Sequence, residues 1–470
     1  MTHVRPKAEP SRVLTVAAIA VVVLALGVVS AVSLLGTAIL LGLTLFVVAA
    51  SLPLWLLPSI SLWLFALIPI GYITGVPTFV ARFWTPAAVV LAIWAVRLVL
   101  HRGRHAFFRS LRWMGPLTVL LIALGFHGLS STRSVNWTVL LIVAVALPTA
   151  LVTAFDDRTS STLLRSWFVL GIGLSVVAVI ESLVESNPLT PYYNFPQHWS
   201  VYRVTTTLGH PLLNGTFFAV TACLAAFSMV RKDGARAAAF LCFVLAALAA
   251  GLTGSRSGVY ALVSGLGVGL LVLLVSGRTS LANKLLGVVL GVTALIVLPA
   301  LPTIAGRASS AEGVASGLYR DDVLRLTGKL FLADPWFGYG PGTSLIATAR
   351  SGAQLPLENS VLGSLVSLGV IGSLGVLVLV VIVFVTSVRG GRPDGIAAVA
   401  AYVVAGAAFP LWESNPAALV LVGFVIIATR VPLAQTGLAP ASAELQRALT
   451  PVPARRPARV LAPVARTARS

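Results

Sequence analysis

The sequence predicts an all-α fold, a polytopic integral membrane helical bundle of about 12 to 14 transmembrane helices with a long extracytoplasmic loop that bears an amphipathic helix. Hydrophobic residues make up 57% of the 470 residues and charged residues only 10%. The mean hydropathy is +0.96, well above that of a soluble domain of this length. One long polar stretch, from Thr303 to Glu358, interrupts the apolar sequence.

Apolar runs of roughly 16 to 25 residues, the length needed to cross a bilayer core, recur along the chain. Prolines in and between the early runs can break a helix or form a re-entrant segment there. Neither cysteine belongs to a disulfide or metal pattern, because both lie inside apolar runs. The fourteen candidate spans lie near 13–31, 34–50, 53–73, 86–100, 115–130, 136–154, 163–183, 211–230, 236–252, 258–277, 284–304, 359–387, 395–411 and 416–432.

The basic residues indicate an orientation. If the spans alternate, the side that holds the N-terminus collects 24 of the 33 Lys and Arg residues. The positive-inside rule then places both termini in the cytoplasm. The predicted organisation is a cytoplasmic N-terminus (1–12), transmembrane helices with an outer loop at 181–210 (13–302), a large extracytoplasmic loop (303–358), C-terminal transmembrane helices (359–432) and a disordered basic cytoplasmic tail (433–470).

Several arginines fall on the outer side, against this bias. Arg203 lies in V-Y-R-V-T-T-T-L-G-H-P-L-L-N-G, Arg256 lies in T-G-S-R-S-G, and Arg320 and Arg325 lie in the large loop. A guanidinium group suits a diphosphate, because its planar fork pairs with two oxygens and keeps its charge. A lipid-headgroup or salt-bridge role is the simpler explanation for any single one of them. Arg256 is the strongest candidate, because flanking glycines allow close backbone approach.

The large loop contains two further features. Residues 317–331 repeat apolar side chains at helical spacing and predict an amphipathic helix lying on the membrane as a lid. Glu358 precedes the next apolar run, where it serves either as a catalytic base or as an ordinary helix cap. His210 and His198 are the alternative bases, and Asn359 and His210 are candidate substrate-binding residues. No metal or nucleotide motif occurs, so no cofactor is predicted.

These motifs resemble, in order, those of the O-antigen ligase and polymerase superfamily, bacterial membrane enzymes that transfer glycans from a polyprenyl diphosphate carrier. The resemblance covers residues 200 to 380 and includes Y-R-D-D-V-L-R-L…D-P-W-F-G-Y-G-P-G and E-N-S-V-L-G-S-L-V-S-L-G-V-I-G. It implies that Arg203, Arg256 and Arg320 hold the carrier diphosphate. In the ligases the last motif begins with a histidine thought to activate the acceptor, and Glu358 stands there instead. This departure allows a polymerase or a divergent transferase.

The predicted function is metal-independent, inverting transfer or polymerisation of a glycan from a polyprenyl-diphosphate-linked donor onto an acceptor hydroxyl. The expected partners are that donor, a glycan or lipid acceptor and membrane lipid, without nucleic acid, in the cytoplasmic (inner) membrane. A transporter or flippase of lipid-linked sugars is the alternative, and it predicts broken helices near mid-membrane and a repeat between halves. A non-catalytic membrane scaffold is a third possibility, which leaves the outer arginines unexplained.

Overall fold

The computed structural model describes residues 47–68, 72–74, 85–103, 119–120, 122, 124, 131–152, 154, 156–193, 202–229, 236–275, isolated positions between 281 and 296, 311–353, 357–390 and 392–429. The N-terminal segment 1–12 and the tail 433–470, both expected in the cytoplasm, and His198 lie outside the described residues. The expected spans at 13–31, 34–50, 115–130 and 284–304 lie wholly or largely outside them.

The described chain is a membrane bundle of α-helices, as predicted. Its described residues contain no strand, only one isolated bridge between Ile73 and Tyr193. Within the part of the chain that the structure describes, five helices are long and apolar enough to cross a membrane: 132–150, 157–184, 211–228, 256–275 and 360–385. Five shorter apolar helices cover 57–67, 86–101, 236–252, 393–407 and 416–429. Together they match the ten expected spans that the structure describes.

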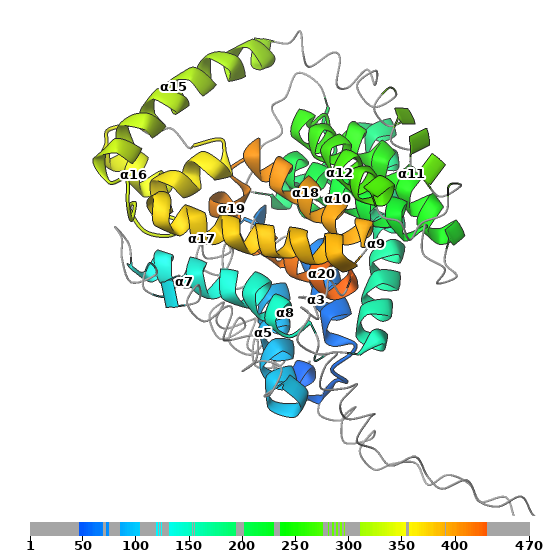
Figure 1. Cartoon of the computed structure of the whole chain (residues 1–470). Coiled ribbons are helices and arrows are strands. Elements are labelled where there is room, and N and C mark those ends of the chain that lie inside the picture. Colours follow the sequence, from blue (N-terminus) through cyan, green and yellow to red (C-terminus); the bar gives the residue numbers. More distant parts are fainter. Residues whose placement is uncertain are drawn as a thin grey trace, which may run out of the picture. The chain divides into compact units, whose positions relative to one another are not determined.

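The helices follow the chain in the order shown in Figure 1. Prolines occupy the first turn of several, where a missing amide hydrogen costs nothing, and Thr85 and Asp156 cap α5 and α9 with side-chain oxygens. The main elements are α3 (Leu57–Leu67), α5 (Pro86–Leu98), α7 (Ser131–Leu141), the π-helical turn η3 (Ile142–Ala146), α8 (Leu147–Ala150), α9 (Asp157–Val184), α10 (Pro211–Ser228), α11 (Arg236–Leu252), α12 (Arg256–Val275), α15 (Ala311–Ala333), α16 (Ser344–Arg350), α17 (Ser360–Gly390), α18 (Pro393–Ala407), α19 (Leu411–Ser414) and α20 (Val420–Thr429).

Small residues let the central helices α10, α12 and α18 approach closely. A methyl group added to Gly265 of α12 would lie 2.6 Å from the Ala397 carbonyl oxygen of α18 and 2.6 Å from Sγ of Cys223. Glycine at such a crossing is typical of membrane helices, where packing rather than the hydrophobic effect holds helices together. Cys223 and Cys242 are both buried free thiols, as expected for small core residues.

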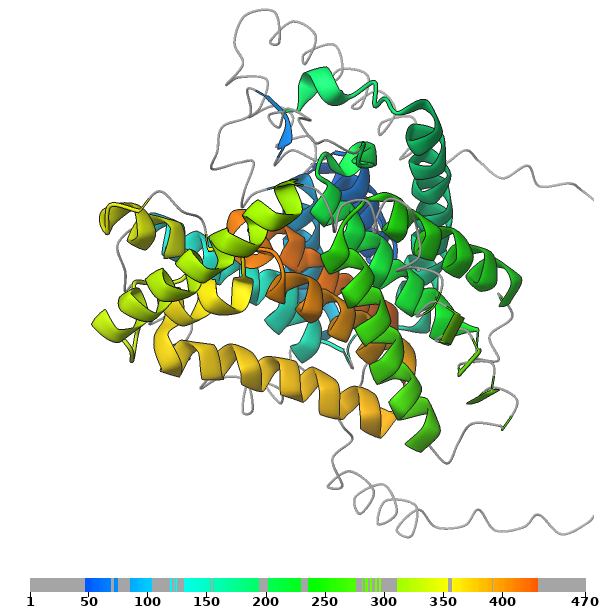
Figure 2. The same cartoon turned by 90° about the horizontal axis from the view of Figure 1, so that it is seen from above.

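The large polar loop folds onto the start of α17, and we call residues 311–368 the loop subdomain. Figure 2 shows α15 and α16 at the end of α17 where that helix begins. Their shared apolar core is separate from the main one and consists of Val323, Leu330, Ala347, Leu357 and Val366, with Tyr319, Leu326, Tyr339 and Leu362 at its edge. The helix predicted over 317–331 is therefore confirmed as part of α15, and its apolar residues from Tyr319 to Leu330 pack into the core of the loop subdomain. The face that carries Asp321, Arg325 and Lys329 is exposed.

The expected span 359–387 is a broken helix. Gly369 has φ 60° and ψ −167°, so the helical geometry stops there and resumes after it. The D-P-W-F-G-Y-G-P-G segment fills the break: the amides of Tyr339 and Gly340 donate to the carbonyls of Val366 and Ser367. In return, the amide of Val370 donates to the Pro335 carbonyl at 2.8 Å. The loop thus satisfies the polar backbone groups that the break frees, as a spanning segment requires.

Candidate functional site

The Arg203 and T-G-S-R-S-G motifs, 50 residues apart, meet in the structure. Nε of Arg203 donates to the Thr253 carbonyl at 3.1 Å, and the side chain is only 5% exposed. Gly254 has φ 59°, and a methyl group there would lie 3.3 Å from Cγ of Arg203. The glycine therefore both makes the turn between α11 and α12 and leaves room for the arginine stem.

The same two motifs join α10 to α12 at a close crossing. A methyl group on Gly258 would lie 2.9 Å from Cα of Gly215, closer than real packing allows. This contact aligns the start of α12, where Arg256 is the first helical residue, with the start of α10. Arg256 is half-buried and has no hydrogen-bond or ion-pair partner within the described part of the chain. Its guanidinium is available to a ligand beside two helix N-termini, which favour negative charge.

His210 holds a structural position that makes it a poor general base. Its ring is stacked between Tyr72 and Phe409, at centroid distances of 5.2 Å and 5.4 Å. Nδ1 accepts from the Leu212 amide at 3.2 Å and so caps α10. Burial, and then the positive charge of Arg203, lower the pKa of His210 to about 3. The imidazole is therefore neutral at physiological pH with its proton on Nε2, which can donate but not accept.

A buried carboxylate holds the segment around Arg203 in place. Glu181 of α9 accepts from the amides of Thr205 and Thr206 at 2.7 and 2.8 Å. It also accepts from the Tyr202 hydroxyl at 2.9 Å and from the Asn187 amide group at 3.3 Å. These contacts hold the backbone after Arg203 and the side chain of Tyr202 before it, and they support the positive φ of 41° at Thr206. We assign Glu181 to positioning the arginine motif, because its oxygens are already occupied.

The connection between α18 and α19 links the arginine motifs to the loop subdomain. Phe409 stacks on His210 with its ring and accepts from the Ser360 hydroxyl with its carbonyl, at 2.7 Å. The Ser360 oxygen in turn accepts from the Trp412 amide at 3.1 Å. The first and the last of the four sequence motifs are thereby connected through one short segment.

Glu358 lies at the exposed edge of this assembly. It is not the cap of α17, because Oδ1 of Asn359 accepts from the amides of Val361 and Leu362 at 2.8 and 3.1 Å. The alternative that Glu358 is a helix cap is therefore wrong, and the capping role falls on Asn359. Glu358 faces Tyr319 of α15: burial and then the charge of Glu358 raise the pKa of Tyr319 to about 12. Arg320 and Arg325 are exposed on α15, and α15 packs against α16 and α17.

A second carboxylate, Glu413 of α19, is buried beside the start of α17. It is 4% exposed, and Oε2 accepts from the Ser344 amide at 3.1 Å and from the Ser344 hydroxyl. Burial raises the pKa of Glu413, although the Ser344 and Ser367 hydroxyls and the charge of Arg133 oppose the shift. The sequence offered one signal for this residue, a single carboxylate between two apolar runs in L-W-E-S-N, and the sequence analysis assigned it no role.

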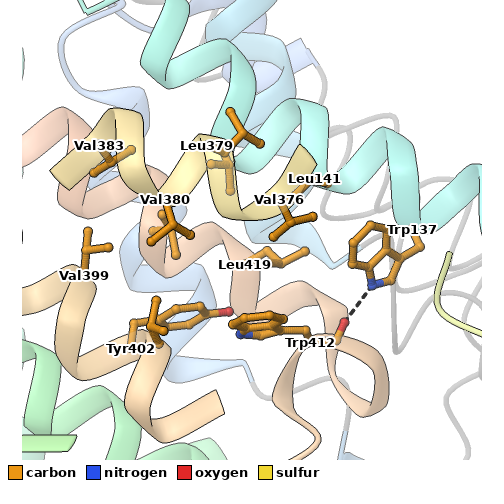
Figure 3. Close-up of a pocket in the computed structure, with 13 residues that line it drawn as sticks. Trp137, Leu141, Val376, Leu379, Val380, Val383, Val399, Tyr402, Trp412 and Leu419 are labelled. Atoms are coloured by element: carbon orange, nitrogen blue, oxygen red, sulfur yellow. Dashed lines mark hydrogen bonds between the residues drawn. The ribbon is translucent and has the colours of Figure 1, made fainter. Parts of the chain in front are cut away.

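An apolar pocket of about 50 Å³ is lined in part by Trp412, the residue before Glu413 (Figure 3). Trp137 and Trp412 form one end of it, and the Trp137 indole donates to the Trp412 carbonyl at 2.8 Å. Valine and leucine side chains from the second part of α17, from α18 and from η3 form much of the remaining wall. The wall has no exposed polar atoms, so the pocket suits a few methylene-sized groups of a hydrocarbon chain.

Comparison with known proteins adds no assignment: no protein-family model matches the chain, and no curated protein matches it. Among the described residues, no group of three or more His, Cys, Asp or Glu side chains could hold a metal ion. The candidate site therefore rests on its own geometry. It combines Arg203 at the turn before α12, Arg256 at the start of α12, an exposed and a buried carboxylate, and an apolar pocket.

Proposed function

We propose that this chain is a membrane glycosyltransferase that transfers or polymerises a glycan from a polyprenyl-diphosphate-linked donor onto an acceptor hydroxyl. The observation that carries the proposal is the junction of Arg203 with the Gly254 turn, which places Arg203 beside the turn that leads into Arg256, the first residue of α12. Fixed positive charge of this kind stabilises the diphosphate that leaves in such a reaction. Arg320 and Arg325 on the exposed face of α15 add positive charge to the loop subdomain.

In the proposed reaction, the acceptor oxygen attacks the anomeric carbon of the donor. A new carbon–oxygen bond forms while the bond from that carbon to the phosphate oxygen breaks, and the diphosphate leaves with the electron pair. Glu358 takes the acceptor proton, since it is the exposed carboxylate at the start of α17. One direct displacement inverts the anomeric centre. Asn359 and His210 are proposed to line the substrate path, the latter as a hydrogen-bond donor through Nε2.

The apolar pocket supports an amphiphilic substrate. All but one of its lining residues belong to candidate membrane helices, and the exception, Trp412, precedes Glu413. A ligand with a hydrocarbon part and a charged head needs such adjoining apolar and polar surfaces. We place a segment of the lipid carrier's chain in this pocket as part of the same proposal.

One observation favours a second function, transport of a lipid-linked sugar. The break at Gly369 makes α17 a discontinuous helix, and transporters use such helices to bind polar substrates within the membrane. The two functions differ in one measurement. A transporter moves the lipid-linked sugar across a vesicle membrane without an acceptor, whereas a transferase consumes the donor only when an acceptor is present.

Arg256 provides the direct test of the diphosphate site. Arg256→Lys keeps the charge and loses the bidentate fork, so we expect a loss of at least about tenfold in kcat/KM for the lipid-linked donor. The measurement is donor consumption by the purified protein in proteoliposomes. Arg236→Lys at the other end of α11 is the matched control and should retain full activity. Equal rates for Arg256→Lys and the wild type would remove Arg256 from the proposed diphosphate site.

The proposed topology puts the loop subdomain outside the cytoplasm, with both termini inside. Ser351 is exposed in that subdomain, so Ser351→Cys should react with an impermeant maleimide in intact cells with a permeable envelope. The native thiols are buried and should remain unlabelled. Labelling that appears only after lysis would reverse the orientation.

A further inference from the structure

Several polar contacts join the loop subdomain to the helix bundle, and Glu413, Ser360 and Arg133 make some of them. The subdomain has its own small apolar core. Its chain enters the bundle at Gly369, where the helix is broken. Because the loop subdomain has its own core and is followed by this break, its position on the helix bundle depends on the contacts near Gly369.

Glu413 supplies a contact of this kind from the bundle side. Its Oε2 accepts both the amide and the hydroxyl of Ser344, the first residue of α16. A methyl group on Gly363 would lie 3.5 Å from Cδ and Oε1 of Glu413 and 3.5 Å from Oγ of Ser344. The carboxylate therefore touches both α16 and the first part of α17, and both belong to the loop subdomain.

Arg133 of α7 reinforces the same junction from another helix. Its Nε donates to the Gly342 carbonyl in the loop subdomain. One of its terminal nitrogens donates to the backbone carbonyl of Glu413 at 3.3 Å. The guanidinium thus bridges the two bodies through backbone oxygens and fixes the main chain that carries the carboxylate.

We propose that Glu413 is a positioning residue that seats the loop subdomain on the helix bundle and so sets Glu358 relative to the donor held by Arg203 and Arg256. This inference rests on the proposed function. Glu413 does not touch the substrate in this role, because its carboxylate is enclosed and bonded to Ser344. This positioning depends on the shape of the Glu413 side chain and on an oxygen that accepts hydrogen bonds. It does not need the negative charge, since burial favours the neutral carboxyl group.

The variants follow from this geometry. Glu413→Ala removes both bonds to Ser344 and leaves a void between α16 and α17. Glu413→Gln keeps an oxygen that can accept from Ser344 and has nearly the same volume, so the seat should be retained. Asp322→Ala, which removes an exposed carboxylate of α15, is the matched control.

The first readout needs no substrate. Spin labels are attached to two introduced cysteines, Leu324→Cys on α15 and Leu183→Cys on α9. The two leucine side chains are 59% and 80% exposed. The wild type, Glu413→Gln and Asp322→Ala should give one narrow distance distribution by double electron–electron resonance in nanodiscs. Glu413→Ala should give a broad or shifted one while remaining helical and monodisperse. If the distance distribution of Glu413→Ala is unchanged, Glu413 does not position the loop subdomain. The same conclusion holds if Glu413→Gln changes the distribution as much as Glu413→Ala does.

The second readout separates positioning from fold. In donor-transfer assays, Glu413→Ala should lower kcat by about tenfold to a hundredfold, with KM for the donor within about twofold, because the donor-binding arginines lie on the bundle. Glu413→Gln should restore at least half of kcat. A shifted distance distribution with unchanged kcat would overturn the positioning role. Absence of transfer by the wild type would instead count against the proposed function and leave the distance result unaffected.

Discussion

Glu358→Gln is expected to lower glycan turnover by about two to four orders of magnitude while donor binding is retained. The amide keeps the size of the side chain and cannot take the acceptor proton. The fold should tolerate the change, because Glu358 is exposed and Asn359, not Glu358, caps α17. A loss of turnover can therefore be attributed to chemistry and not to a weakened helix.

The experiment compares single-turnover rates and donor affinity in the same preparation. Asp321→Asn, a neutralised exposed carboxylate on α15, is the matched control and should turn over at the wild-type rate. Wild-type turnover in Glu358→Gln would remove Glu358 from the mechanism. His210 could not then replace it without losing its cap on α10, because Nδ1 is already bonded to the Leu212 amide.

The fold was predictable where it depends on local pattern. Apolar runs of bilayer length identify the membrane helices, and Pro86, Pro211 and Pro393 mark where three of them begin. The apolar face of α15 was likewise visible, since Val323 and Leu330 recur at helical spacing and both are buried. These features need only neighbours a few residues away.

The site was predictable only in part, because its contacts are long-range. The sequence places Arg203 and Arg256 in separate motifs, and the close approach of Gly215 to Gly258 becomes evident only in three dimensions. The role of Glu413 depends on Ser344, 69 residues earlier. His210 likewise stacks on Tyr72 and Phe409, which are distant from it in sequence. This burial and its bond to the Leu212 amide make the histidine a helix cap and a poor base.

The break in α17 could not be predicted from the sequence, because Gly369 resembles the other glycines of its motif. Gly372, three residues later, occupies a helical position in the same span. What distinguishes Gly369 is the loop that pairs with its flanking backbone, and that loop comes from residues 335–340. A glycine in a membrane helix predicts close packing as readily as a break.

Gly369→Ala is expected to give the largest loss of stability among single methyl additions to α17. Its φ of 60° with ψ of −167° lies in a region that is almost exclusive to glycine, which costs an alanine roughly 1 to 3 kcal/mol. The added methyl group would also collide with the Trp336 carbonyl oxygen and lie 2.6 Å from the Phe337 amide nitrogen. Backbone cannot move aside as a flexible side chain can, so the loop has to separate from the break.

Thermal unfolding in detergent, followed by intrinsic fluorescence, measures this effect. We expect Gly369→Ala to lower the apparent Tm by several degrees and to expose the amides of Tyr339 and Gly340 to hydrogen exchange, because their acceptors lie at the break. Gly173→Ala, inside α9 with no atom within 4 Å of the new methyl group, is the matched control and should unfold like the wild type. An unchanged Tm together with unchanged exchange at Tyr339 would mean that α17 is continuous through Gly369 and that the loop does not pair with it.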